Sequence, residues 1–198
     1  MVVSCGTPPG AIVGEPIQQG AAVLVTHRES TDEGGGSAVT AGTSAYRWTH
    51  PGTLRLYVQG SSSLTGWSPR HLALVDEAVH AWMVCDGVRI DVVSWPVNAD
   101  VRLYWTDRLP PTNPGVTMLY RNSSGRLTHA DMFISVQPPP WHTGTPDRVL
   151  YATIAHELGH ALGLPHDPSA DALMHPSPLV TEVTKVDMAR LGALLRGP

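Results

Sequence analysis

The sequence has 198 residues, a formal net charge of −4 at pH 7 and a pI near 6.2. This length suits one domain with a tail and is enough to bury a hydrophobic core. The mild charge and the lack of a Lys/Arg cluster argue against a nucleic-acid partner, and no apolar run approaches the roughly 20 residues of a membrane span.

The first 45 residues are rich in Gly, Ser, Thr and Pro. Such a composition buries too little apolar surface to offset the entropy lost on ordering, so we predict a flexible tail over residues 1–45. Within it, residues 21–26 could form a short strand. An ordered domain is predicted over residues 46–198. The first residues carry neither a charged n-region nor an apolar h-region, so we expect no signal peptide at this N-terminus.

Beyond Tyr46 the apolar residues follow two periods. Apolar alternation and turn signals predict five strands, over residues 54–58, 88–92, 101–105, 115–120 and 127–136. Helical spacing, with a capping residue and a proline at the start of the first two segments, predicts helices over residues 68–87, 146–162 and 184–197. The last helix opens with Thr184 and Asp187, which resemble a capping box with Asp in the usual Glu place.

The stretch from Tyr151 to His166 reads YATIAHELGHALGLPH. On a helix, His156 and His160 project from one face one turn apart, so both can bind one metal ion, and Glu157 lies beside that ion without binding it. Gly163 permits a sharp turn that returns a third imidazole from His166. Three neutral nitrogens and an open fourth position are typical of a catalytic zinc site.

This extended pattern is the metzincin signature, and Ala172 to Pro176 (ALMHP) resembles the Met-turn of the matrixins. The chain therefore resembles a metzincin metallopeptidase, and most closely the matrixin family, over residues 46–198. The resemblance implies an α+β, zincin-like catalytic domain with a twisted mixed five-stranded sheet and three main helices. It places one catalytic zinc ion in a cleft between an upper and a small lower subdomain.

The resemblance also implies a function, namely a secreted, monomeric zinc endopeptidase that acts on protein or peptide substrates. Glu157 is expected to be the general base, and Met174 is expected to form a hydrophobic floor beneath the zinc ligands. A large apolar residue is expected after the cleaved bond, in a pocket bordered by Ala152, Pro176 and Leu179. Val116, Thr117 and Met118 are expected to contact the substrate from an edge strand.

Three features depart from the matrixin pattern. Asp167 follows the third histidine, where matrixins usually have Ser, and His175 stands where they commonly carry Tyr. The loop that holds structural zinc and calcium in matrixins is short here, with His129, Asp131 and Asp107 as the remaining candidate ligands, so we expect that site to be missing or reduced. On the predicted strand, His129 and Asp131 are expected to form an exposed polar face.

Two questions stay open at this level. Cys5 could be a zinc-capping switch, although Ser4 replaces the arginine that normally precedes it; it could also be a lipid anchor, a disulfide partner of Cys85 or a free thiol. A catalytically idle zinc-binding module and a self-directed processing enzyme or toxin with one dedicated target are the alternatives to a general endopeptidase. The intact Glu157 argues against the idle module.

Overall fold

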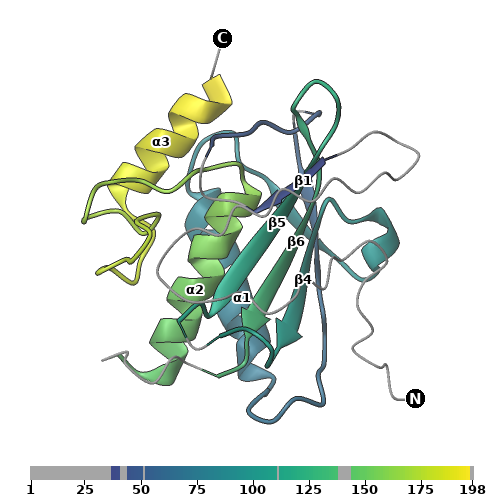
Figure 1. Ribbon diagram of the computed structural model, residues 1–198, viewed down its shortest axis with the longest axis vertical. Helices are drawn as coiled ribbons and strands as arrows, with labels where there is room; N and C mark the ends of the chain where they lie inside the picture. Colours follow the sequence, from purple (N-terminus) through teal and green to yellow (C-terminus); the bar gives the residue numbers. More distant parts are fainter. Residues whose placement is uncertain (1–36, 41–43, 51, 111, 138–143, 197–198) are drawn as a thin grey trace.

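A six-stranded mixed sheet with helices on one face forms the core of the protein (Figure 1). The computed structural model describes residues 37–40, 44–50, 52–110, 112–137 and 144–196. The strands are β1 (Ser37–Thr40), β2 (Leu54–Val58), β3 (Ile90–Val93), β4 (Val101–Thr106), β5 (Gly115–Arg121) and β6 (Leu127–Ser135). The helices are α1 (Arg70–Met83), the short 3-10 helix η1 (Pro96–Asn98), α2 (Pro146–Ala161) and α3 (Lys185–Arg196).

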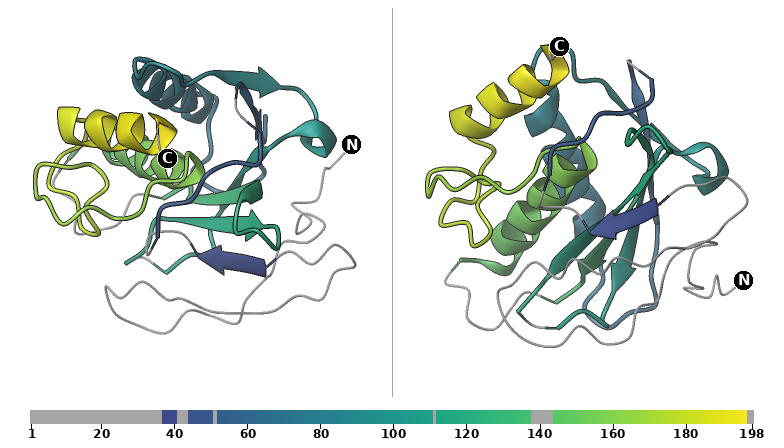
Figure 2. Two further views of the ribbon diagram at one scale, coloured as in Figure 1. Left: turned by 90° about the horizontal axis from the view of Figure 1, so that it is seen from above. Right: turned by 45° about the horizontal axis from the view of Figure 1, so that its top comes forward.

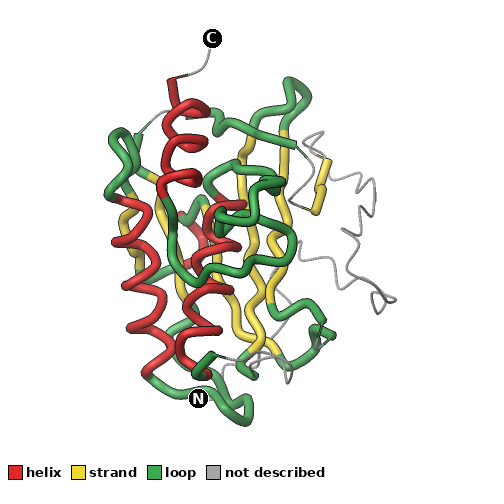
Figure 3. The backbone as a smooth tube through the Cα atoms, turned by 90° about the vertical axis from the view of Figure 1, so that its left-hand side faces the viewer, coloured by secondary structure: helices red, strands yellow, loops and turns green. Residues whose placement is uncertain are grey.

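The strand order across the sheet is β1-β5-β6-β4-β2-β3. The strands β3, β2, β4 and β6 are mutually parallel, whereas β5 runs antiparallel to β6 and β1 runs antiparallel to β5. Figures 1 and 3 place α1 and α2 side by side on one face of this sheet, and α2 packs on α1, β5 and β6. The active-site segment predicted from the sequence thus lies on a helix pressed against the antiparallel side of the sheet.

Alternation along the strands explains which face is covered. Along β4, Val101, Leu103 and Trp105 are buried toward the helices, while Arg102 and Tyr104 point to the other face. The sheet residues meet the buried faces of α1 and α2 in one core, where Trp82 of α1 donates from Nε1 to the Ala155 carbonyl of α2 at 2.9 Å. Packing on both helices therefore fixes how α2 lies on the sheet.

The expected fold class is confirmed, and each of the five predicted strands and three predicted helices is found. The sixth strand, β1, was not predicted. The expectation of a flexible tail through residue 45 is wrong for residues 37–40, because their backbone pairs with residues 118–121 of β5. Figure 2 shows β1 at the edge of the sheet, where it lies next to β5. The proposed strand at residues 21–26 and Cys5 lie outside the described residues.

Residues 46–48 attach the start of the domain to the end of α2. Tyr46 N donates to the Gly163 carbonyl at 2.9 Å, and Trp48 Nε1 donates to the Ala161 carbonyl at 3.0 Å. Arg47 Nε donates to the Leu194 carbonyl of α3 at 3.0 Å. These donors satisfy carbonyl groups that helix ends otherwise leave without a partner.

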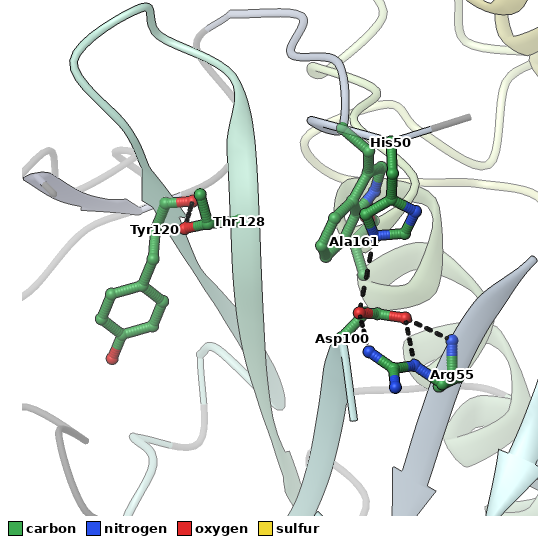
Figure 4. A network of polar contacts seen from close by, with 7 residues as sticks. His50, Arg55, Asp100, Tyr120, Thr128 and Ala161 are labelled. Carbon is green, nitrogen blue, oxygen red and sulfur yellow. Dashed lines mark hydrogen bonds and ion pairs between the residues drawn. The ribbon is translucent and has the colours of Figure 1, made fainter. Parts of the chain in front are cut away.

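A buried carboxylate fixes the parallel side of the sheet (Figure 4). Asp100 is 5% exposed and accepts hydrogen bonds from Arg55 N at 2.8 Å, Nη2 at 2.9 Å and Nε at 3.2 Å, with His50 Nε2 at 3.5 Å. Burial acts to raise the pKa of Asp100, but the bonds from Arg55 outweigh it and the pKa is lowered. The charged network joins the start of β2 to the start of β4.

Among the described helices, none is both long and apolar enough to cross a membrane.

Candidate metal centre

The helix α2 begins as the sequence predicts, with Thr145 as the N-cap in an extended conformation and Pro146 in the first turn. Asp147 lies in that turn, where a negative charge is favourable beside the helix N-terminus. The helix is buried along most of its second half, including His160 and Glu157. Its 16 residues carry His156 and His160 to the end that faces the turn at Gly163.

Three imidazoles converge at this end of α2. The ligand atoms of His156, His160 and His166 all lie within 4.8 Å of one another, and this is the one such group of three or more metal-binding side chains among the described residues. The two Nε2 atoms of His160 and His166 are 3.3 Å apart. The structure thus brings together the three residues that the motif selected.

The return of His166 depends on the backbone at Gly163. Its φ is +100°, in the region that favours glycine, and a Cβ there would collide with the carbonyl oxygen of Tyr46. Two hydrogen bonds close the turn, from Gly163 N to the His160 carbonyl at 2.9 Å and from Leu164 N to the Gly159 carbonyl at 3.0 Å. A side chain at Gly163 would therefore disturb both the turn and the contact with residues 46–48.

Backbone carbonyls orient two of the imidazoles. His156 Nδ1 lies 2.7 Å from the Leu173 carbonyl oxygen, and His160 Nδ1 lies 2.8 Å from that of Leu164. A proton on each Nδ1 satisfies these contacts and leaves Nε2 with a free lone pair, as a metal ligand requires. The Nδ1 of His166 is buried and has no protein partner among the described residues.

Burial keeps the three imidazoles neutral. It lowers the pKa of His156, lowers that of His160 well below its usual value, and lowers that of His166 to about 4. The positive charge that each neighbouring histidine would carry adds to this effect for His160 and His166. At neutral pH the nitrogens are available to bind a metal without first losing protons.

These donors fit a zinc ion. Zinc–nitrogen bonds of about 2.0–2.1 Å at tetrahedral angles separate two ligand nitrogens by about 3.3–3.4 Å, and the Nε2 atoms of His160 and His166 are 3.3 Å apart. Imidazole nitrogen is a preferred zinc ligand, and three of them leave a coordination position open. The chemistry and the spacing of the donor set therefore agree.

The segment after His166 packs beneath the cluster. Met174 is 1% exposed, and a Cβ on Gly159 of α2 would collide with its sulfur and lie 2.8 Å from Trp82 of α1. The thioether thus fills the space between α2 and the turn. Gly159 is the helical position that makes this close approach possible.

Asp187 of α3 binds the backbone of the turn that carries Met174, a role that the sequence did not reveal. Its carboxylate is 1% exposed and accepts hydrogen bonds from Leu173 N and Met174 N, both at 3.0 Å, and from the backbone and hydroxyl of Thr184 at 2.8 and 2.7 Å. The contacts with Thr184 confirm the predicted capping box. Because Leu173 is also the partner of His156, one carboxylate connects α3 to the histidine cluster.

Asp167, one of the departures from the matrixin pattern, has a structural environment. It is 6% exposed, its Oδ2 lies 2.8 Å from Arg190 Nε, and its Oδ1 accepts from Ser169 N at 2.8 Å. Its own amide donates to the Met174 carbonyl at 2.8 Å. This residue joins the loop of the third histidine to the Met-turn and to α3.

Glu157 is buried on the other side of α2, against β5. It is 7% exposed, and its Oε2 accepts a hydrogen bond from the Thr117 hydroxyl at 2.7 Å. Burial raises the pKa of Glu157 to about 7, and the bond from Thr117 acts in the opposite direction. A carboxyl group with such a pKa can take up and release a proton near neutral pH.

The residues expected around a substrate differ in their exposure. Ala152 is 6% exposed and belongs to the hydrophobic core, while Pro176 is exposed and Leu179 is 82% exposed. On β5, Met118 pairs with Thr40 of β1, so the expectation that residues 116–118 lie on an edge strand is wrong at Met118. The pairing with β1 extends over residues 118–121 and does not include Val116 and Thr117.

The polar residues on β6 differ from the expectation of an exposed face. Asp131 is 1% exposed, and its Oδ1 lies 2.7 Å from His129 Nε2 and 3.9 Å from Arg102 Nη1. The expectation is wrong for Asp131, because the neighbouring side chains on the strands beside it cover the carboxylate.

Two other residues singled out in the sequence lie elsewhere. Asp107 follows the end of β4. Within the Met-turn, His175 Nδ1 lies 2.9 Å from the Ser177 carbonyl oxygen.

Comparisons with known proteins agree with this geometry. The family model described as matrixin, a peptidase family, matches residues 94–191. The chain is 34% identical to stromelysin-1 of Rattus norvegicus over 70 residues, which cover 35% of this chain and 14% of that protein. It is 34% identical to interstitial collagenase of Aquarana catesbeiana over 77 residues, covering 39% of this chain and 20% of that protein.

A shorter match reaches higher identity. Over 33 residues the chain is 58% identical to matrix metalloproteinase-B of Caenorhabditis elegans, which covers 17% of this chain and 6% of that protein. The aligned part is thus a fifth or less of the length of each of these three relatives. The matched family model, the three relatives and the converging histidines together identify the chain as a matrixin-like metzincin.

Proposed function

We propose that this protein is a zinc-dependent endopeptidase that hydrolyses internal bonds of protein or peptide substrates. In this proposal residues 46–198 form the catalytic domain, which acts as a secreted monomer, as metzincin-like peptidases generally act outside the cell. His156, His160 and His166 hold a single zinc ion. The observation that carries the proposal is the combination of three converging neutral imidazoles with the buried carboxyl group of Glu157.

The chemistry is divided between the ion and the protein. When bound, zinc supplies Lewis acidity, which polarises a peptide carbonyl and makes water a better nucleophile near neutral pH. Glu157 accepts a proton from the attacking water and then delivers it to the departing amine. Its pKa of about 7 suits both halves of this transfer, since a carboxylate of ordinary pKa would be a weaker base toward the attacking water.

A substrate is proposed to bind as an extended chain beside Val116 and Thr117. Their backbone lies beyond the residues of β5 that pair with β1. It belongs to the start of β5, where Gly115 and Thr117 approach Glu157. Addition of a peptide to a sheet edge uses main-chain hydrogen bonds and is largely independent of sequence. The side chains of the substrate then determine which bond is cleaved.

We further propose a preference for a large apolar residue after the cleaved bond, in a site bordered by Ala152, Pro176 and Leu179. The segment that carries Leu179 is attached to the start of α2, since Arg148 Nε donates to Thr181 Oγ1 at 3.1 Å and its guanidinium pairs with Glu182. The exposed Leu179 offers apolar surface, and burying a Leu, Met or Phe against such surface contributes on the order of 1.5–3 kcal/mol.

The test is a mixed peptide library incubated with the zinc-loaded protein, with and without a chelator, and read by mass spectrometry. We expect internal cleavage that the chelator abolishes and added zinc restores, with Leu, Met, Ile or aromatic residues after the cut. Zinc binding without cleavage of any peptide would indicate a non-catalytic module. Cleavage before Asp or Lys would contradict the proposed specificity while leaving the endopeptidase activity established.

A further inference from the structure

The start of β5 encloses the Glu157 carboxylate from two sides. Thr117 is 1% exposed, and its hydroxyl lies 2.7 Å from Glu157 Oε2 and 3.1 Å from the Glu157 carbonyl oxygen. Two residues earlier, a Cβ added to Gly115 would lie 2.6 Å from Glu157 Cγ and 2.8 Å from Oε1. Both residues therefore contact the side chain of Glu157 directly, and neither leaves room for it to move toward the strand.

The two contacts leave the carboxylate oxygens in different surroundings. A threonine hydroxyl has one proton to donate, and the shorter contact directs it to Oε2. Among the described residues no protein donor reaches Oε1, so this oxygen is free to face a water molecule. A hydrogen bond to a charged group is stronger than one between neutral groups, and inside a protein it also restricts the rotation of the side chain.

We propose that Thr117 is a positioning residue for the general base. Its hydroxyl holds Oε2 so that Oε1 faces the attacking water, and the missing side chain of Gly115 keeps the space that the carboxylate occupies. The inference rests on the proposed function, in which Glu157 moves the proton. It differs from the expectation that Thr117 serves as a substrate contact, because its side chain is turned inward to Glu157.

The test compares variants of the zinc-loaded full chain by steady-state kinetics on a peptide that the parent cleaves. Thr117→Val keeps the shape and removes the hydroxyl, whereas Thr117→Ser keeps the hydroxyl and removes a methyl group. We expect kcat of Thr117→Val to fall by about tenfold, with KM within about twofold of the parent and zinc content unchanged. Thr117→Ser should stay within about threefold of the parent kcat.

Thr128→Val is the matched control. It makes the same chemical change on β6, where the hydroxyl of Thr128 donates to the Tyr120 carbonyl at 3.2 Å (Figure 4) and makes no bond to Glu157. Its kcat should equal that of the parent. Gly115→Ala, which requires no unusual backbone conformation, should lower kcat in the same way as Thr117→Val because it displaces the carboxylate.

Several outcomes would overturn the inference. A parental kcat in Thr117→Val would show that the hydroxyl is not needed. An equal loss of kcat in Thr117→Val and Thr117→Ser would assign the effect to packing. A rise in KM alone would show that Thr117 contacts the substrate. If Thr117→Val does not fold, Thr117→Ala removes the same hydroxyl with less bulk and is judged by the same criteria. A parent without chelator-sensitive cleavage would refute the proposed function itself, before any variant is compared.

Discussion

The two sides of α2 at the metal centre are assembled from different distances along the chain. His156 and His160 face Leu164 and Leu173, which follow within the next 17 residues. Glu157 faces Thr117, 40 residues earlier and on another element. The three histidines are thus arranged by local chain geometry, whereas the environment of Glu157 exists only once the helix has packed on the sheet.

The sharpest way to separate the two sides is to remove a ligand. His160→Ala is expected to lose stoichiometric zinc and all chelator-sensitive activity, because a site with three protein ligands cannot spare one of them. Metal analysis of the purified variant checks this, with circular dichroism as a control for folding. Full zinc content in His160→Ala would mean that other residues bind the ion.

A substitution of Glu157, on the side of α2 that faces β5, should leave the zinc bound. Glu157→Gln keeps the size of the side chain but cannot accept a proton, so kcat should fall by at least about 100-fold, the low end expected for loss of a general base. Zinc content should equal that of the parent. A variant that cleaves as fast as the parent would show that another group moves the proton.

A substitution in α3 should have a smaller effect on zinc binding. Asp187→Asn replaces one of the accepting oxygens beneath Leu173 and Met174 with a donor, so buried amides lose their partner. We expect the free energy of unfolding to fall by about 1–3 kcal/mol and zinc affinity to fall by roughly tenfold. Denaturant unfolding and competition with a chelator measure these two quantities. Parental zinc affinity would show that the turn holds His156 without help from α3.

The weakest predicted effect is a dependence of the stability of the metal-free protein on pH. The lowered pKa values of the three histidines mean that the unfolded state binds more protons below pH 6.5, so stability falls as pH drops toward 5. Glu157 acts in the opposite sense, because its raised pKa makes the folded state hold an extra proton between about pH 4.5 and 7.

The three histidines, together with His71, whose pKa is also lowered by burial, outweigh one glutamate, so the thermal midpoint of the metal-free protein should be lower at pH 5 than at pH 7. His166→Asn should reduce this difference, since it removes one of the groups that titrate. A midpoint that rises toward pH 5 would contradict the assignment of buried neutral imidazoles.

The comparison of the two sides of α2 also explains what the sequence could predict. The histidines, Gly163 and Met174 lie within 19 residues, and their spacing on a helix and a turn determines the cluster. The strands and helices were predicted because their apolar residues repeat with clear periods. The capping box of Thr184 and Asp187 was recognisable because it is also a local pattern.

The features that were missed depend on distant contacts. Nothing in the sequence near Asp187 indicates that it also binds the backbone of Leu173, 14 residues earlier. The inward orientation of Thr117 depends on α2, which begins 29 residues later, at Pro146. The strand β1 is four residues long in a segment rich in small residues, and its pairing depends on the backbone groups that β5 offers rather than on its own composition.

The attachment of residues 46–48 sets the shortest chain that should remain active. A truncated protein that begins at Ser44 keeps the donors of Tyr46, Arg47 and Trp48, which bind carbonyl groups at the ends of α2 and α3. One that begins at Thr49 exposes those carbonyls and frees the turn that carries the third histidine. Limited proteolysis should therefore spare the domain when it cuts before residue 44 and inactivate it when it cuts five residues later.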